Sequence, residues 1–424
     1  NMTFAFILGH VLLGASLLAL AVDSNSAFVG SAANGSLLLR PASGQQVLVD
    51  GVAFQSLLER LDRLDAQSQQ LATQSQQLAT QSEQISQLNR KLSSHLAGLK
   101  CNAAAADTTS IVGLGGVGRW SGGVAAPNGK IYGIPHNANA VLIVDPASNT
   151  VDTTSIVVSN GGAYWYGGVL AGNGKVYGMP SNADAVLVID PATNAVDYTS
   201  ITVPNGDGKW AFGVLASNGK IYGVPHLAAL VLIVNPATNT TDTTSMAGFD
   251  GLATKWLGGT LAGNGKIYCI PFHASQVLII DPDTNTTDTT SINGLTGDNK
   301  WWGGVLAANG KIYGIPRSSD SVLIIDPTTN TADITTMAGL SGAWAGGVLA
   351  PDGKIYGMPL LASSVLIIDP ATNTTDTTSL TVPAGGVNWR GGVLAESGKI
   401  YGIPANADSA LIIHSTCTVT GGLS

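Results

Sequence analysis

The chain has 424 residues, only 11% of them charged, and a net charge of −8. Because it is acidic and has no basic tract, we do not expect it to bind nucleic acid. Its three cysteines are too few for a disulfide scaffold, and none has the spacing of a zinc site. The composition therefore predicts a protein with no metal site and no cofactor.

The first 27 residues have the pattern of a targeting segment. Residues 4–22 form an apolar run broken only by His10, and small residues follow it, as in a cleaved secretory signal peptide. The run would also span about 28 Å as a helix, enough for a retained membrane anchor. Residues 25–30 resemble the junction of an algal plastid-targeting signal. We predict a secreted or cell-surface protein, with a retained anchor as the alternative, plastid targeting as a less favoured one, and membrane contact only through such an anchor.

A helical stalk is predicted next, over 53–100, after a short β or linker segment at 28–52. Apolar residues recur every seven positions at Leu57, Leu64, Leu71, Leu78, Ile85, Leu92 and Leu99. This heptad pattern is typical of a coiled coil that joins two or three chains. The intervening core positions are serine or asparagine through the middle of the stalk, so a single solvated helix or a disordered Gln/Ser linker remains an alternative.

One pattern then repeats seven times to the end of the chain, with a spacing of 43 to 46 residues. Each copy has a tryptophan, at 120, 165, 210, 256, 301, 344 and 389, and a tyrosine twelve residues later. Four strand-like segments recur in each copy: GGVLA, KIYGIP, VLIID and DTTSI. This period predicts an all-β, seven-bladed β-propeller with four-stranded blades over 101–424.

The Gly-Gly pair of the first segment predicts close approach of seven inner strands around one axis. It recurs in every copy except the third, where Phe212 replaces the first glycine.

The ends of the repeat region predict how the ring closes. The last copy lacks its fourth strand after Ile413, and an extra DTTSI precedes the first copy at 107–111. We therefore predict that an N-terminal strand completes blade seven, because an open ring would leave unpaired sheet edges. Cys101 and Cys417 flank this joint and are predicted to form a disulfide. Cys269 replaces a glycine of the second strand and is predicted to be a buried free thiol.

The stretches AVLVIDPATNAVDYTSITVPNG and GVLASNGKIYGV resemble the YVTN-type β-propeller repeat of surface-layer and cell-surface proteins. The resemblance covers nearly all of the chain after the stalk. It implies an extracellular binding or structural propeller and carries no catalytic residue. This chain has YGIP where that family has its eponymous tetrapeptide, and it adds the repeated tryptophan.

Candidate ligand residues lie in the loops that join fourth to first strands and second to third strands, because these loops vary between copies while the strands do not. The varying residues are Arg119, His136, Tyr164, Tyr166, Lys209, Lys255, His226, Phe272, His273, Lys300, Trp302, Arg317, Asp320 and Arg390. Aromatic and polar side chains together suit sugar recognition. From this set the predicted ligand-binding residues are Tyr164, Tyr166, Lys209, Lys255, Lys300, Trp302 and Arg390.

Two of these assignments have structural alternatives. The three lysines stand at equivalent positions of successive blades, where they would form either an arc that attracts anionic glycans or an ordinary solvated rim. The seven repeated tryptophans would either contact ligand or pack between blades.

An enzyme is the less favoured interpretation. Lactonase-like propellers gather acidic residues around a metal, whereas the repeats of this chain contain one glutamate, Glu396, and no catalytic triad or carboxylate pair. A calcium site at Asp145, Asn149 and Asp152 competes with simple Asx turns. Asn34, Asn239, Asn285 and Asn373 lie in N-glycosylation sequons.

The sequence thus predicts a non-enzymatic extracellular protein that presents propellers on an oligomeric stalk and binds glycan or protein. The alternative is a structural subunit of an extracellular filament, hair or coat.

Overall fold

The computed structural model forms two compact units, Asn1–Gly98 and Leu99–Ser424. The residues that it describes are 10–13, 16–19, 27–31, 37–41, 48–49, 52–53, 59, 62–77, 80, 99–101, 104–158, 164–249, 254–383, 389–415 and 417–419.

The described residues of the first unit form three short antiparallel strand pairs and a helix. The pairs are β1 (His10–Leu13) with β2 (Ser16–Ala19), β3 (Ala27–Ser31) with β4 (Leu37–Pro41), and β5 (Leu48–Val49) with β6 (Val52–Ala53). The helix covers residues 62–77, and both of its predicted heptad leucines, Leu64 and Leu71, are exposed in the single chain. Most of the predicted coiled coil lies outside the described residues, so its pairing stays a prediction. Within the part of the chain that is described, no helix combines the length and apolarity needed to cross a membrane.

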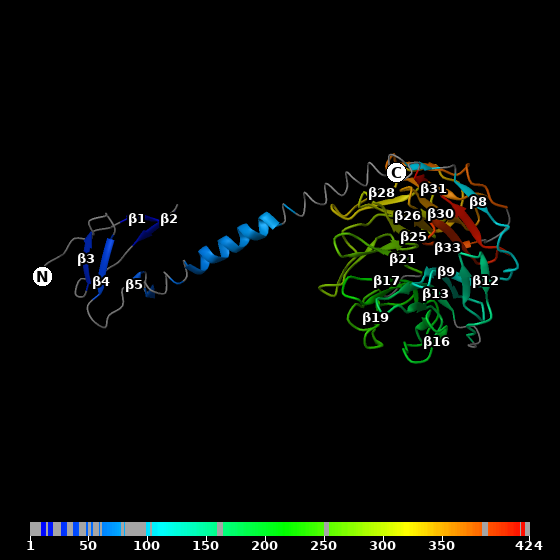
Figure 1. Ribbon diagram of the computed structural model, residues 1–424, viewed down its shortest axis with the longest axis horizontal. Helices are drawn as coiled ribbons and strands as arrows, with labels where there is room; N and C mark the ends of the chain where they lie inside the picture. Colours follow the sequence, from blue (N-terminus) through cyan, green and yellow to red (C-terminus); the bar gives the residue numbers. More distant parts are fainter. Residues whose placement is uncertain are drawn as a thin grey trace, which may run out of the picture. The chain divides into compact units, whose positions relative to one another are not determined.

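The second unit is a seven-bladed propeller, which confirms the predicted fold (Figure 1). Each blade is a four-stranded antiparallel sheet. The innermost strands are β9 (Trp120–Ala125), β13 (Trp165–Leu170), β17 (Trp210–Leu215), β21 (Trp256–Leu261), β25 (Trp301–Leu306), β29 (Trp344–Leu349) and β33 (Trp389–Leu394). The second strands are β10 (Ile131–Pro135), β14 (Val176–Pro180), β18 (Ile221–Pro225), β22 (Ile267–Pro271), β26 (Ile312–Pro316), β30 (Ile355–Pro359) and β34 (Lys399–Pro404).

The third strands are β11 (Leu142–Asp145), β15 (Leu187–Asp190), β19 (Leu232–Asn235), β23 (Leu278–Asp281), β27 (Leu323–Asp326), β31 (Leu366–Asp369) and β35 (Leu411–His414). The outer strands of blades one to six are β12 (Thr150–Asp152), β16 (Ala195–Asp197), β20 (Thr240–Asp242), β24 (Thr286–Asp288), β28 (Thr331–Asp333) and β32 (Thr374–Asp376). They have three residues each.

Blade seven is closed by an N-terminal strand, as predicted, but the strand is β8 (Ala105–Asp107) rather than 107–111. Its residues Ala105, Ala106 and Asp107 pair with His414, Ile413 and Ile412 of β35. The boundary was wrong because DTTS is a turn. The Asp107 carboxylate accepts the backbone N–H of Thr109 at 2.7 Å, which turns the chain out of the sheet. The outer strands of the other blades end at the equivalent residue.

A further short pair lies beside the closure. In β7 (Leu99–Cys101) and β36 (Cys417–Val419), the backbone of Cys417 stands directly opposite that of Cys101. Only the backbone of these two residues is described, so the disulfide between them stays a prediction.

The hydrophobic core is divided into seven clusters, and each lies between two neighbouring blades. The seven repeated tryptophans are 0–2% exposed within them. Each indole Nε1–H donates to the backbone carbonyl twenty residues later in its own blade, at 2.7–2.9 Å. These tryptophans therefore pack the core, and each satisfies its indole N–H within it. Of the two predicted alternatives, packing between blades is confirmed over contact with ligand.

Four of the repeated tyrosines, at 132, 222, 268 and 401, donate a hydrogen bond to the next blade. Tyr401 of blade seven donates to Asn149 Oδ1 of blade one at 2.9 Å, and Tyr268 of blade four donates to Asn330 Oδ1 of blade five at 2.7 Å. Blade seven has no turn between its third and fourth strands, because its fourth strand comes from the chain's beginning. Tyr356 of blade six therefore has no turn asparagine to bond in blade seven, and its O–H donates instead to Asp352 of its own blade, at 2.7 Å.

The first glycines of the Gly-Gly pairs form a ring around the axis. Gly258 has φ +86°, and a Cβ built on it would lie 2.8 Å from Cα of Gly303 in the next blade. A side chain has no space there, and the backbone conformation itself favours glycine. Close approach of the inner strands thus explains the glycines, as predicted.

Candidate functional site

Two sets of side chains surround one end of the axis. The first set follows the repeated tryptophan on each innermost strand: Ser121, Tyr166, Ala211, Leu257, Trp302, Ala345 and Arg390. The second set follows the proline that ends each second strand: His136, Ser181, His226, Phe272, Arg317, Leu360 and Ala405. The tryptophan and proline positions are cross-strand partners, as Trp165 and Pro180 are, so both sets lie at the same end of the blades. We call this end the mouth.

The mouth has an apolar cluster of its own, separate from the seven between blades. Its buried members are Ala211, Leu257, Phe272, Trp302, Ala345 and Leu360, and Tyr166 and Phe212 pack against it. These residues come from five blades. The cluster is therefore assembled by five consecutive blades rather than within any one of them.

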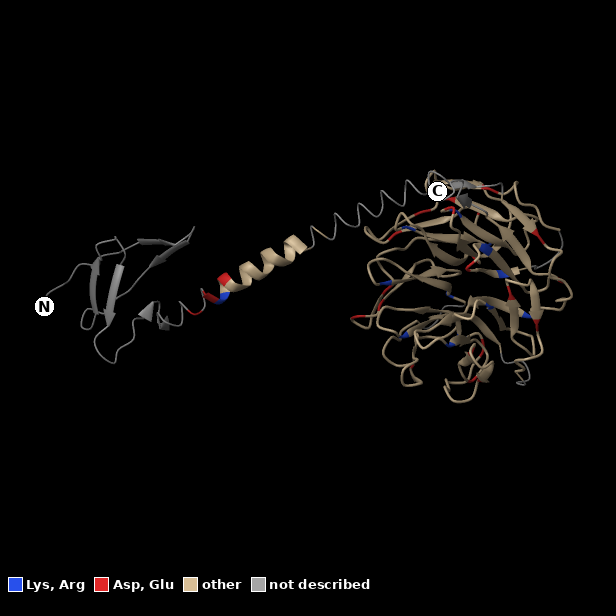
Figure 2. Cartoon of the chain, in the orientation of Figure 1, with Lys and Arg blue, Asp and Glu red and all other residues tan. Residues whose placement is uncertain are grey.

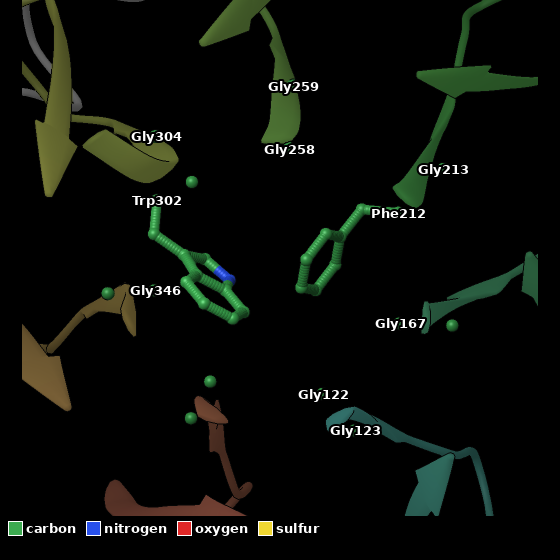
Figure 3. A pocket seen from close by; sticks show the side chains of 15 residues that line it. Gly122, Gly123, Gly167, Phe212, Gly213, Gly258, Gly259, Trp302, Gly304 and Gly346 are labelled. Carbon is green, nitrogen blue, oxygen red and sulfur yellow. The ribbon is translucent and has the colours of Figure 1, made fainter. Parts of the chain in front are cut away.

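A channel of about 180 Å³ lies on the axis at the glycine ring (Figure 3). Of the described residues that line it, all but two are glycines of the Gly-Gly pairs. The two others are Phe212 of blade three and Trp302 of blade five, whose rings project toward each other across the channel. The channel volume is about tenfold the space that one water needs, so the channel has room for a ring-sized group.

Phe212 is held in a strained conformation. Its φ is +64°, in the ring position where the other six blades have glycine. For a bulky residue this left-handed conformation costs about 1–2 kcal/mol. Its ring lies over Gly167, where any side chain would collide with it. Strain that the rest of the ring avoids points to a role in function, since such outliers persist mainly at functional sites.

Two arginines lie on Trp302. Cζ of Arg390 is 5.7 Å from the centre of the indole ring and Cζ of Arg317 is 5.9 Å from it, so both make cation–π contacts. Burial lowers the pKa of Arg317, and the charge of Arg390 lowers it further, which places the two guanidinium groups near each other. Charged residues are sparse on the described chain (Figure 2), and its four ion pairs all join lysine to aspartate.

The mouth also holds the unsatisfied polar atoms. In the described residues, the buried side-chain N and O atoms without a hydrogen-bond partner are Ser121 Oγ, His136 Nδ1, Trp302 Nε1, Arg317 Nε, and Nε and Nη1 of Arg390. All five residues belong to the two sets that surround the mouth. Buried polar groups are normally paired, so their collection at one place indicates a site for a polar ligand or ordered water.

A second aromatic group connects blades one and two. The His136 ring stacks on Tyr164 at 4.8 Å between centroids and meets Tyr166 edge-on at 4.6 Å. Burial, with the nearby charge of Arg390, lowers the pKa of His136 to about 4, so the ring is neutral at pH 7. The structure thus brings four predicted ligand residues, Tyr164, Tyr166, Trp302 and Arg390, to the mouth.

The prediction that three lysines bind ligand was wrong. Lys209, Lys255 and Lys300 are at most 5% exposed, so they form neither an arc for ligand nor a solvated rim. The Lys300 ammonium donates to the carbonyls of Phe272 at 3.2 Å, Ala274 at 3.0 Å and Gly297 at 2.7 Å. Lys209 and Lys255 likewise donate to carbonyls in the loop of the preceding blade. These lysines fasten neighbouring loops together.

The predicted sequons in the propeller lie at exposed turns. Asn239, Asn285 and Asn373 occupy left-handed positions with φ of +53° to +55°. The same turn in blades without a sequon carries Asn149, Asn194 and Asn330, whose Oδ1 accepts a tyrosine O–H of the preceding blade. The sequon side chains make no such bond, so their amides are free to carry a glycan. Asn34 lies outside the described residues.

Two other expectations concern metal and thiol. Asp145 and Asp152 accept backbone N–H groups two residues ahead, at 2.9 and 2.7 Å, as Asx turns do. Across the described ranges no group of three His, Cys, Asp or Glu side chains is placed to hold a metal ion. Cys269 is a buried free thiol, as predicted, and burial raises its pKa.

Comparison with known proteins supports the fold. No protein-family model matches the chain, and no curated protein matches its sequence. The YVTN-type resemblance therefore stays a prediction, although the seven-bladed propeller that it implied is confirmed.

Solved structures resemble the propeller at low sequence identity. An inactive variant of virginiamycin B lyase from Staphylococcus aureus, crystallised with quinupristin, has a TM-score of 0.58 and 12% identity; the match covers 74% of this chain and 98% of the lyase. The extracellular domain of a hybrid two-component system from Bacteroides thetaiotaomicron has a TM-score of 0.57 and 12% identity, covering 76% of this chain and 44% of that one. Hydrazine synthase from Kuenenia stuttgartiensis has a TM-score of 0.54 and 13% identity, covering 74% and 98%. These likenesses show the fold alone.

Proposed function

We propose that this chain is an extracellular, non-enzymatic glycan-binding protein whose site is the mouth. The observation that carries the proposal is the facing pair of Phe212 and Trp302 in a channel otherwise lined by glycine. Neither residue belongs to the repeat at its position, and Phe212 is kept against a backbone preference. A side chain that served only packing would not need to stand in the channel.

Sugar chemistry suits this pair. The C–H faces of a sugar ring pack on aromatic rings, and polar groups beside them orient the hydroxyls. At the mouth such polar groups belong to Trp302, Arg317 and Arg390, each of which has a nitrogen without a hydrogen-bond partner. The channel volume matches a terminal or single sugar unit, with the rest of a glycan outside.

Several observations support binding rather than catalysis in an extracellular setting. The two described sets of mouth residues contain no aspartate or glutamate, so they offer neither a carboxylate pair nor the acid of a Ser-His-Asp triad. Three unbonded sequon asparagines and a secretory-type N-terminus fit a secreted glycoprotein. A stalk that joins two or three chains would raise the avidity of each weak site. The structural-subunit interpretation becomes the better one if no ligand binds.

The test is a glycan array probed with the full chain and with Phe212→Gly, Trp302→Ala and Tyr198→Ala. Tyr198 is a matched aromatic control, because it contacts Trp165 in blade two rather than the mouth. We expect binding by the parent and Tyr198→Ala, and at least tenfold weaker binding by the two mouth variants.

Thermal unfolding of the same variants separates function from folding. Phe212→Gly relieves left-handed strain of about 1–2 kcal/mol but also removes a ring that packs against the mouth cluster, so the two effects partly offset and Tm should fall by only a few degrees while binding is lost. Unaltered glycan binding by Phe212→Gly would contradict the proposed site, and no binding by the parent would contradict the proposed function.

A further inference from the structure

The two arginines at the mouth lack the partners that arginines usually have. Their Cζ atoms lie 5.7 and 5.9 Å from the same Trp302 ring, on side chains from blades seven and five. Three of their buried nitrogens, Arg317 Nε and Nε and Nη1 of Arg390, have no hydrogen-bond partner. Among the described residues, no carboxylate makes an ion pair with either arginine.

This arrangement is unfavourable on electrostatic grounds. Two like charges near one another repel, and a partly buried guanidinium loses solvation without a compensating bond. A third arginine shows the contrast, since Arg119 donates from Nη1 to the carbonyl of Gly115 at 2.9 Å and to that of Leu114 at 3.3 Å. Within the described residues no carbonyl accepts a hydrogen bond from Arg317 or Arg390, and both side chains are only partly buried, so their guanidinium groups can turn a donor to an external acceptor.

The other groups around the pair are donors or neutral. Trp302 Nε1 is a buried donor without an acceptor. His136 faces the same space as a neutral ring, and the Tyr166 side chain lies close enough to Arg317 to influence its charge. A site with two cations and an indole N–H, and with no aspartate or glutamate in the two described sets of mouth residues, is chemically complementary to an oxyanion.

We propose that the mouth selects an anionic sugar, with its carboxylate or sulfate group on Arg317 and Arg390 and its ring against Trp302. The inference rests on the proposed function and adds the ligand class. In this proposal Arg317 and Arg390, rather than the buried lysines, cause the preference for acidic glycans. Arginine suits the role because its planar fork can bond both oxygens of such a group.

Calorimetric titration of the full chain tests it with matched ligands. Oligogalacturonate is compared with its methyl ester, which keeps the rings and removes the charge, and a sulfated oligosaccharide is compared with its desulfated form. We expect at least about tenfold weaker binding of the uncharged member of whichever pair binds. The pair that shows this difference identifies the anionic group.

The protein variants are Arg390→Gln, Arg317→Gln, Arg390→Lys and Lys220→Gln. The glutamine variants should lose about tenfold or more in affinity for the charged ligand, and Arg390→Lys should lose several-fold because it keeps charge without the fork. Lys220→Gln removes the same charge from a hairpin at the other end of the blades, and it should bind within about twofold of the parent.

The outcomes separate this inference from the proposed function. If charged and uncharged sugars bind equally and Phe212→Gly abolishes both, glycan binding stands and the anionic preference is overturned. If no sugar binds, inorganic sulfate is titrated at constant ionic strength against chloride. A rise in Tm that Arg390→Gln abolishes would keep the anion site and overturn the glycan. No such rise would overturn both.

Discussion

Substituting Gly258 by alanine tests whether contact between blades at the axis stabilises the ring. A Cβ on Gly258 would lie 2.8 Å from Cα and 3.3 Å from N of Gly303. Both atoms are backbone, so neither can swing away as a flexible side chain would. The neighbouring strand has to move, and every other strand of the closed ring constrains that movement.

The magnitude follows from two separate costs. Alanine at φ +86° costs about 1–2 kcal/mol for the left-handed conformation. Overpacking against the next strand adds about 1–3 kcal/mol. Gly265 supplies the matched control in the same blade, because its φ is +79° and nothing lies within 4 Å of its built Cβ. Reduced freedom of the unfolded chain affects both variants alike and cancels in the difference.

Thermal and denaturant unfolding of the parent, Gly258→Ala and Gly265→Ala provides the measurement. At about 2 °C per kcal/mol, Gly265→Ala should lower Tm by about 2–4 °C and Gly258→Ala by about 4–10 °C. Equal losses in the two variants would refute the reasoning, because they would show that contact with Gly303 contributes nothing.

Three further predictions concern the lysines, the turns and acid. Lys300→Met should destabilise the propeller by about 2–4 kcal/mol, because it leaves three backbone carbonyls without their donor. Lys311 is exposed and ion-paired, so Lys311→Met should change stability by less than about 1 kcal/mol. Equal effects of the two variants in denaturant unfolding would contradict the buried role of Lys300. Asn330→Ala should lose about 1 kcal/mol more than Asn285→Ala, because both side chains occupy left-handed turns but only Asn330 accepts the Tyr268 O–H. Acid should lower the stability of the fold in two steps, the first from histidines and the second from aspartates. A Tm that stays constant from pH 7 to pH 2 would contradict both steps. Burial lowers the pKa of His136 and His226 to about 4, so the stability they give is present above about 6.5 and lost as pH falls to about 4. Hydrogen bonds from the DTTS-type turns lower the pKa of their aspartates, such as Asp152 and Asp288, to about 2, so that contribution is lost between about pH 4 and pH 2.

The architecture was predictable because it is written locally in each repeat. Period, turn residues and the alternation of apolar segments gave the number of blades and the strand order. The surplus DTTSI gave the closure. Its boundary was wrong because a Thr-rich segment with β propensity predicts a strand, whereas the Asp107 side chain turns the backbone there.

The site was predictable only in part, because it is assembled across the ring. Phe212 was visible in the sequence as the exception to the Gly-Gly pair, but its position facing Trp302 depends on two blades that are not neighbours. Arg317 was one of many varying loop residues until the structure placed it beside Arg390. The lysines were misplaced because residue type alone predicts a solvated ammonium, whereas the preceding blade's loop supplies carbonyls that bury it.

The three-residue outer strand of blade seven has a consequence for assembly. Ala105–Asp107 is the place where the ring receives a strand from a distant part of the sequence, and β35 recognises it through backbone pairing that a second copy of this segment could make equally well. When several chains fold side by side, the β8 segment of one can complete the last blade of another. Such exchange would interlock two propellers without a new interface, because the contacts made are those already present in the closed monomer.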